Sequence, residues 1–230
     1  FHGGFSTGHG FLREPNDISS YSALACIANQ SNQNDQHGGQ SVPNFDYSMA
    51  EGVKKTYAHR YVQNVAKALS LIGGINDADK KAAEIADNIK ENSGLVPTLS
   101  LCDDYLKKEN AMLLEFVNEQ TADKIQKFAI EYAEKETDRA TYQAMEALIH
   151  NLNTMNSRAG AQTPFSSINY GTDTSPEGRM VIKNVLLAQE RGLGNGETPI
   201  FPIHIFKIKE GINYNPEDVN YDLFKLACRV

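Results

Sequence analysis

The chain changes its hydrophobic pattern at Asn153, and this change is the strongest constraint on its fold. Before this residue, apolar side chains recur every three or four positions, which predicts a series of helices. After it, segments typical of strands and of helices alternate, at residues 163–170, 176–191, 199–208 and from 221 onward. This β–α–β–α order predicts a parallel α/β sheet or barrel. We therefore expect a helix-rich part, residues 1–152, and a βαβα part, residues 153–230, within one incomplete domain.

The helix-rich part can be divided by its capping residues and glycines. Helices are expected to begin at Asn16 or Asp17, at about Phe45, after Asn76 or Asp77, at Leu101 and at Ala122. The first helix should end within the polar stretch QSNQNDQHGGQS, residues 30–41, because its side chains compete for backbone hydrogen bonds. We interpret this stretch as a solvated turn, with a ligand-binding loop as the alternative. The later strand IFPIHIFKI is apolar on both faces and is expected to be covered on both sides.

Charge and composition exclude several classes of function. The 230 residues include 22 Lys and Arg against 29 Asp and Glu, a net charge of −7, which argues against a nucleic-acid partner. No apolar run reaches the roughly 20 residues that a membrane helix needs, and the stretch FHGGFSTGHGF lacks the features of a signal peptide. Three cysteines without a CxxC pair and six histidines without an HxxxH pair predict neither a disulfide framework nor a metal site. We expect a cytoplasmic protein with reduced thiols.

The polar stretch from Asn153 to Arg179 is the best candidate for chemistry. Its centre has the composition of a strand, and Ser175 with Pro176 should cap and start the next helix. Unpaired N–H groups at such a helix start can bind an anion, and Arg158 and Arg179 could add positive charge. A capped connection without a ligand explains the same residues equally well.

Two nearby segments have structural interpretations. The segment GLGNGETP, residues 192–199, lacks the GK[ST] ending of a phosphate loop and precedes a strand, so it predicts a turn with Gly192 or Gly194 as the helix cap. His204 lies between Ile203 and Ile205 and is interpreted as a hydrogen-bonded core residue.

Four long motifs carry a resemblance to a known family that covers essentially the whole chain, including its helical middle. They are GGFSTGHGFLREPNDISSYSALA, QSNQNDQHGGQSVPNFDY, NLNTMNSRAGAQTPFSSINYGTDTSPEGR and GLGNGETPIFPIHIFKIKEGINYNPEDVNYDLFKLA. Together they closely resemble the anaerobic (class III) ribonucleoside-triphosphate reductases. The resemblance implies part of a ten-stranded α/β barrel from an oxidoreductase that is usually a homodimer. Its substrates would be ribonucleoside triphosphates, and its allosteric effectors would be ATP and dNTPs.

The resemblance also implies radical chemistry. In this family a C-terminal glycyl radical, installed by an iron–sulfur, S-adenosylmethionine-dependent activase, creates a cysteine thiyl radical that abstracts the ribose 3′ hydrogen. Formate or a thioredoxin-type system supplies the electrons, and a structural zinc lies near the C-terminus. The family's active-site cysteines belong to motifs upstream of FHGG and downstream of LFKLA. We therefore expect an internal section that has no catalytic residue and is inactive alone.

Other roles follow from the same resemblance. An effector is expected to bind near Arg13, Asn16 and His59, with Arg60 as an alternative to His59. A loop and strand between the effector and substrate sites are expected to include Ser157, Arg158, Gly160, Gln162, Ser166 and Asn169. The cysteines match no catalytic motif and are interpreted as small buried apolar side chains; they are Cys26, Cys102 and Cys228.

The motifs also allow two alternatives to a section of the reductase. A non-catalytic nucleotide-binding and dimerisation module derived from the same family would carry the same residues. A related glycyl radical enzyme, such as a formate-lyase, matches the motifs less well.

Overall fold

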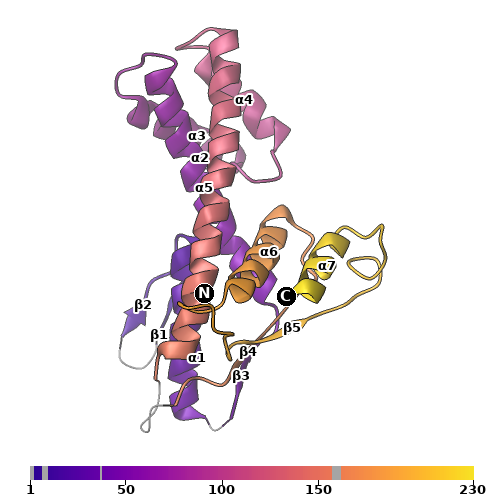
Figure 1. The fold of residues 1–230 in the computed structure, drawn as a ribbon. Coiled ribbons are helices and arrows are strands. Elements are labelled where there is room, and N and C mark those ends of the chain that lie inside the picture. Colours follow the sequence, from indigo (N-terminus) through magenta and orange to yellow (C-terminus); the bar gives the residue numbers. More distant parts are fainter. Residues whose placement is uncertain (1–2, 7–9, 37, 157–161) are drawn as a thin grey trace. The chain divides into compact units, whose positions relative to one another are not determined.

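The structure is a computed structural model that describes residues 3–6, 10–36, 38–156 and 162–230 (Figure 1). The described residues form seven helices and five short strands, so the predicted α/β class is confirmed. Two compact units are present. The first combines residues 1–53 with 138–230, and the second comprises residues 54–137. The division at residues 152 and 153 and the ten-stranded barrel stay predictions.

The first unit is built on a three-stranded parallel sheet. Its strands are β3 (Gln40–Val42), β4 (Ser166–Tyr170) and β5 (Ile203–Phe206), in the order β3-β4-β5. Ser167 pairs in parallel with Ser41 on one side and with Ile203 on the other. The predicted parallel arrangement of the two later strands is confirmed, whereas β3 has no counterpart in the sequence prediction. A separate antiparallel hairpin consists of β1 (Phe5–Ser6) and β2 (Phe11–Leu12).

Helix α1 (Ile18–Asp35) is longer than the sequence predicts. Residues 30–35 continue the helix, so the predicted turn is wrong for the first half of QSNQNDQHGGQS. The side-chain amide of Asn29 donates to the carbonyl of Ala25 at 3.0 Å, and that of Gln33 donates to the carbonyl of Thr163 at 3.4 Å. Asn29 thus shares a carbonyl of its own helix four residues back, Gln33 bonds to a residue outside the helix, and the helix continues through both positions.

Helix α6 (Pro176–Arg191) follows β4 and has the predicted ends. The Ser175 hydroxyl oxygen accepts a hydrogen bond from the N–H of Gly178 at 3.1 Å. Gly192 ends the helix with φ +77°, a conformation that favours glycine. Helix α7 (Tyr221–Arg229) then follows β5 and completes the predicted β–α–β–α order.

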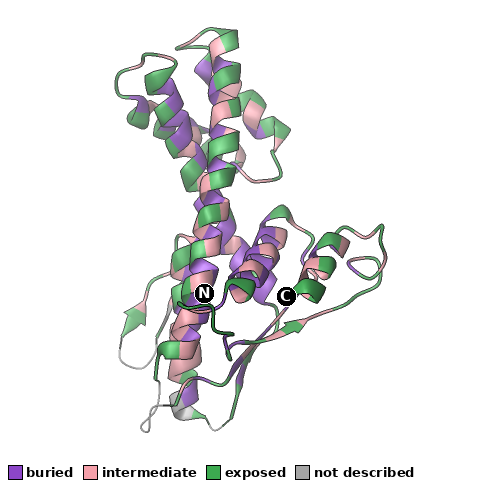
Figure 2. Cartoon of the chain, in the orientation of Figure 1, coloured by how far each residue is buried: buried purple, intermediate pink, exposed green. Residues whose placement is uncertain are grey.

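Side chains alternate across the sheet, and the described residues cover only one of its faces. Ser166, Ile168 and Tyr170 of β4 are buried, whereas Ile203 and Ile205 of β5 are 55% and 42% exposed (Figure 2). The expectation that β5 is covered on both sides is therefore wrong for the described structure. An apolar run cannot by itself distinguish an edge strand from a central one. We call the exposed side the open face; it bears Ser41, Ser167, Asn169, Ile203 and Ile205.

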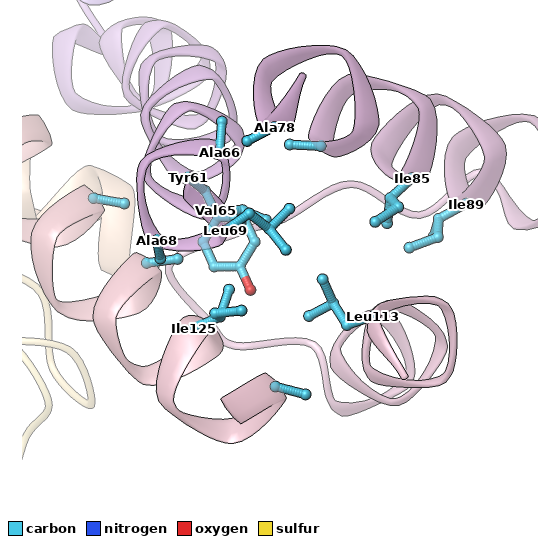
Figure 3. Packing of buried hydrophobic residues seen from close by; sticks show 14 of the residues in the cluster. Tyr61, Val65, Ala66, Ala68, Leu69, Ala78, Ile85, Ile89, Leu113 and Ile125 are labelled. Atoms are coloured by element: carbon cyan, nitrogen blue, oxygen red, sulfur yellow. The ribbon is translucent and has the colours of Figure 1, made fainter. Parts of the chain in front are cut away.

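The second unit is helical. It contains α3 (Ala78–Ser93), α4 (Asp103–Leu113) and the adjoining parts of α2 (Phe45–Leu71) and α5 (Glu119–Thr154). All four helices contribute to one core, in which Tyr61, Leu69, Ile85, Leu113 and Ile125 pack together (Figure 3). This core confirms most of the apolar helical faces that the sequence predicts for residues 57–72, 82–89 and 125–132. The prediction is wrong for Ile72 and Tyr132, the last residues of two of these faces, which are both 44% exposed.

One carboxylic acid lies inside this helical core. Glu109 is 1% exposed, and its Oε2 accepts hydrogen bonds from the Tyr61 hydroxyl at 2.6 Å and the Gln126 amide at 2.9 Å. Burial raises the pKa of Glu109, and the hydrogen bonds from Tyr61 and Gln126 oppose this rise only in part. Ionisation of Glu109 therefore disfavours the folded state.

Replacing Glu109 with Gln is expected to remove a pH dependence of stability in the second unit. Because folding raises the pKa of Glu109, its contribution is fully present below the unfolded pKa of about 4.3. It is lost as the pH rises through the folded pKa. Hydrogen–deuterium exchange should show that the opening free energy of the α4 amides falls across this window in the wild type and stays level in Glu109→Gln.

Glu115→Gln is the matched control, because Glu115 is exposed and close to Glu109 in the chain. It should retain the wild-type pH slope. An unchanged slope in Glu109→Gln would assign the pH dependence to a different group.

Candidate functional site

The carboxyl ends of β3, β4 and β5 lie at one edge of the sheet, because the three strands are parallel. The chain continues from this edge as residues 43–47 after β3, 171–175 after β4 and 207–220 after β5. In open α/β sheets, ligands commonly bind at this edge. We therefore take the edge and the adjoining open face as the candidate functional site.

A buried carboxylate holds the loop after β4. Asp46, in the first turn of α2, is 0% exposed. Its Oδ2 accepts hydrogen bonds from the backbone N–H groups of Gly171, Thr172 and Asp173 at 2.9, 3.0 and 3.0 Å. Successive N–H groups that converge in this way can bind an anion. Here they bind the protein's own carboxylate, so they are not available to a ligand.

Neighbouring groups that could contact an anion also have partners within the protein. The hydroxyl of Ser175 caps α6, and the guanidinium of Arg179 pairs with the carboxylate of Asp222 at 2.8 Å. At the start of α6, the structure therefore favours the capped connection over an anion site. Arg158 lies outside the described residues.

Two fully buried asparagines hold the same loop through its carbonyl groups. Asn213 donates to the carbonyl oxygens of Gly171 at 2.8 Å and Lys207 at 2.9 Å, and Asn220 donates to that of Asp173 at 2.8 Å. Gly171 has φ +118°, and a Cβ at this position would lie 3.0 Å from the carbonyl oxygen of Lys207. Only glycine fits there without strain.

Lys207 brings a positive charge to the open face. It follows Ile205 by two residues, so alternation along the strand places it on the same side. Its Nζ donates to the carbonyl of Pro43 and to Oδ1 of Asn44, both at 2.9 Å. The side chain thus extends from the end of β5, past β4, to the end of β3.

Ser41 and Asn169 add neutral polar groups to the open face. The Ser41 hydroxyl donates to Oδ1 of Asn169 at 3.3 Å. Together with the Lys207 ammonium they provide charged and neutral hydrogen-bonding groups on one accessible surface. Such a set can bind sugar hydroxyls and phosphate oxygens.

On the covered face, His204 and Tyr170 form an uncharged pair. Nδ1 of His204 lies 2.7 Å from the Tyr170 hydroxyl. Burial lowers the pKa of His204 to about 4 and raises the pKa of Tyr170. The interpretation of His204 as a hydrogen-bonded core residue is therefore confirmed. Across the described residues, no group of three His, Cys, Asp or Glu side chains could hold a metal ion.

The three cysteines differ in burial. Cys26 in α1 is 3% exposed, and burial raises the pKa of its thiol to about 11, so the predicted buried apolar role is confirmed. Cys102 is partly buried. The same prediction is wrong for Cys228, which is exposed. Cys228 lies five positions after the buried Leu223 of α7, and at about 100° per residue it points well away from the buried side.

The residues expected to bind an effector all lie at the surface. Arg13 and Asn16 are exposed in the segment that leads into α1, in the first unit. His59 and Arg60 are exposed on the part of α2 that belongs to the second unit, where Arg60 donates to Gln63 at 3.3 Å. Their role in binding an effector stays a prediction.

The residues expected in the loop and strand have different surroundings. Gln162 is exposed just before β4, and Asn169 lies on the open face beside Ser41. Ser166 is buried, at 3% exposure, on the covered face. Three members of the set lie outside the described residues: Ser157, Arg158 and Gly160.

Sequence reasoning misses the residues that hold the edge. Asp46 has the appearance of an ordinary acidic residue in the first turn of a helix, and its partner Gly171 lies 125 residues away. Asn213 and Asn220 lie in a polar connection that contains many candidates for such bonds. The one local signal is Gly171, because a glycine directly after a strand can mark a close approach of backbones.

Comparisons with known proteins then decide the family. The family described as anaerobic ribonucleoside-triphosphate reductase matches residues 1–230. The chain belongs to this reductase family. The anaerobic ribonucleoside-triphosphate reductase of Enterobacteria phage T4 is 28% identical over 225 residues, which is 97% of this chain. The proteins of the same name from Haemophilus influenzae and Escherichia coli are 38% and 37% identical over 97 residues, 42% of this chain.

The match confirms the reductase resemblance that the four motifs indicate. The chain spans 28% of the length of the phage reductase and 14% of each of the two bacterial reductases. Among its described helices, none has both the length and the apolar character needed to cross a membrane.

Replacing Asp46 with Ala is expected to destabilise the loop after β4. It would leave two buried N–H groups and one partly buried N–H group without their shared acceptor, which should cost about 3 kcal/mol of unfolding free energy. Asp46→Asn keeps an acceptor but loses the charge, so it should have an intermediate effect. Urea unfolding and amide exchange at residues 171–173 would measure both.

The exposed Asp103, in the first turn of α4, provides the control. Asp103→Ala should cost no more than about 1 kcal/mol, because it loses only an interaction with the helix dipole. Equal effects of Asp46→Ala and Asp103→Ala would contradict the role assigned to Asp46.

Proposed function

We propose that the complete protein, of which this chain is a section, reduces ribonucleoside triphosphates to deoxyribonucleoside triphosphates for DNA synthesis. The observation that carries this proposal is the family match over residues 1–230. The open face supports it, because Ser41, Asn169 and Lys207 offer the groups that a ribose and a triphosphate require. In this proposal the section holds substrate at the carboxyl edge of its sheet.

The radical chemistry is proposed to come from other parts of the complete protein and from partners. Following the family resemblance, an iron–sulfur, S-adenosylmethionine-dependent activase installs a glycyl radical, and a cysteine outside this chain acts on the ribose. Formate or a thioredoxin-type system is the proposed reductant, and a homodimer with a C-terminal structural zinc is the proposed assembly. The buried thiol of Cys26, whose pKa is about 11, has surroundings that suit a structural role.

Anaerobic turnover of the complete protein tests this proposal. The protein would be activated by its activase and given ribonucleoside triphosphates with formate or, separately, with a thioredoxin system. Formation of deoxyribonucleoside triphosphates is expected. A folded protein that carries its glycyl radical and forms none with either reductant would reject the proposal. The 230-residue chain alone should form none under the same conditions.

Replacing Cys26 with Ser should lower stability but leave turnover per folded enzyme nearly unchanged. The substitution replaces a buried thiol, which has a hydrogen bond with Asn151, by a smaller and more polar hydroxyl, which should cost about 1–3 kcal/mol. The control is Cys228→Ser, which should change neither quantity because Cys228 is exposed. Lost turnover in a folded Cys26→Ser enzyme with a normal glycyl radical yield would show that Cys26 takes part in the chemistry.

The double variant Arg13→Ala, Asn16→Ala should bind a dATP or dTTP effector at least about tenfold more weakly. In the proposal, Arg13 forms charge-assisted bonds with the triphosphate. Equilibrium binding to the complete protein measures the change. Arg139→Ala, which removes an exposed arginine from α5, is the control and should bind normally. Unchanged affinity in the double variant would remove Arg13 and Asn16 from the effector site.

A further inference from the structure

The connection between α6 and β5 contains the only Asn–Gly pair of the 230 residues, Asn195–Gly196. Both residues are exposed, and so is Glu197 after them. The N–H of Gly196 donates to the carbonyl of Leu193 at 2.7 Å, and the N–H of Leu193 donates to the carbonyl of Glu197 at 2.9 Å. We call residues 193–197, which these bonds close, the Asn–Gly turn. The proposed reductase function makes no use of it.

An asparagine that precedes a glycine can lose its side-chain amide without an enzyme. The backbone nitrogen of the glycine attacks Cγ of the asparagine and forms a new C–N bond, which closes a succinimide ring. The amide nitrogen leaves as ammonia and takes the proton of the glycine N–H. Water then adds to either ring carbonyl and leaves aspartate or isoaspartate. Glycine permits the attack most readily, because it has no side chain to hinder the ring.

The carboxylate of Glu197 holds Asn195 at two points. Its Oε2 accepts a hydrogen bond from the backbone N–H of Asn195 at 2.9 Å, and its Oε1 accepts one from Nδ2 of Asn195 at 3.0 Å. Hydrogen bonds from the backbone N–H of Glu197 itself, from the Asn195 side chain and from the Asn195 backbone lower the pKa of Glu197, in this order. The carboxylate is therefore charged at neutral pH, and both bonds to Asn195 are charge-assisted.

These contacts oppose the attack on Cγ of Asn195. The reaction requires the nitrogen of Gly196 to be close to Cγ and to give up its proton. In the folded turn the N–H of Gly196 is bonded to Leu193, and the amide of Asn195 is directed to Glu197. The turn must open locally, and Asn195 must separate from Glu197, before the reactive arrangement can form. The rate of the reaction thus depends on how tightly Glu197 holds Asn195.

We propose that Asn195 is a site of spontaneous deamidation and that Glu197 protects it while the protein is folded. The reaction needs water as its only co-reactant, and neither a ligand nor a partner takes part. Glu197 is a positioning residue in this inference, because it acts on the conformation of Asn195 and not on the bonds that form and break. The inference is independent of the proposed reductase function.

Either product would disrupt the Asn–Gly turn. Aspartate at position 195 would put a second carboxylate beside Glu197, where Nδ2 of Asn195 now donates a hydrogen bond, and the like charges would repel each other. Isoaspartate would lengthen the main chain inside the hydrogen-bonded turn. The start of β5 would keep its own anchor, because Oδ1 of Asn153 accepts hydrogen bonds from the N–H groups of Ile200 and Phe201 at 2.9 and 3.0 Å.

Peptide mapping by mass spectrometry would measure the reaction in the complete protein. The protein would be kept folded at slightly alkaline pH, and the loss of the Asn195 amide would be followed with time. Glu197→Ala should lose this amide at least about fivefold faster than the wild type, because it removes the two bonds that hold Asn195. Glu197→Gln keeps an acceptor oxygen without the charge and should have an intermediate rate. Glu210→Ala, which removes an exposed carboxylate outside the turn, is the control and should retain the wild-type rate.

Two further measurements separate local protection from general damage. Asn92 is exposed near the end of α3 and precedes Ser93, so its amide is an internal reference. A variant that unfolds would lose this amide faster as well, whereas a loosened Asn–Gly turn would leave its rate unchanged. Asn195→Asp, which reproduces one product, should speed amide hydrogen exchange at residues 193–197 and leave residues 203–206 of β5 unchanged.

The possible results decide the inference without a measurement of turnover. Faster loss of the Asn195 amide in folded Glu197→Ala, with the wild-type rate at Asn92, supports it. Equal rates at Asn195 in the wild type and in folded Glu197→Ala would overturn the protective role of Glu197. An intact Asn195 after long incubation of the wild type unfolded in urea would overturn the site itself. If Glu197→Ala does not fold, Glu197→Gln decides between these results in the same way.

Discussion

The carboxylate of Asp46 is the contact on which the edge of the sheet depends. It binds three consecutive N–H groups of the loop after β4, while Asn213 and Asn220 bind the carbonyls of the same loop. One short loop is thus fixed by the segments that follow β3 and β5. The Lys207 ammonium joins those two segments directly. The open face is therefore organised by the protein's own bonds before any ligand arrives, which limits the ordering cost of binding.

Local signals explain what the sequence predicts correctly. The ends of α6 are determined by residues at the ends themselves. Ser175 and Pro176 start the helix and Gly192 ends it, as the sequence predicts. The apolar spacing of the second unit is equally local, because side chains three and four positions apart share a helix face. Residues such as Ile85 and Ile89 could therefore be assigned to a core without knowledge of what they contact.

Non-local contacts explain what the sequence does not reveal. Strand β3 is three residues long and follows a polar stretch. It is extended mainly because it pairs with β4, and its own sequence does not predict a strand. The role of Asp46 as a hydrogen-bond acceptor depends on Gly171, which is 125 residues away in the chain. The apolar character of β5 gives no indication of its edge position. The candidate site consists mainly of such contacts. The sequence therefore indicates which polar residue types lie there, but not which of them come together in space.

The arrangement of the two units along the chain has a consequence for biosynthesis. The second unit is one continuous segment, residues 54–137, whereas the first combines segments on both sides of it. The helical core can therefore assemble while the ribosome is still adding the later strands. Asp46 and β3 cannot form their hydrogen bonds until residues 166–173 have been synthesised, because these residues are their partners. During this interval the edge of β3 and the start of α2 lack the contacts that they have in the folded chain, and an unpaired strand edge is prone to aggregation.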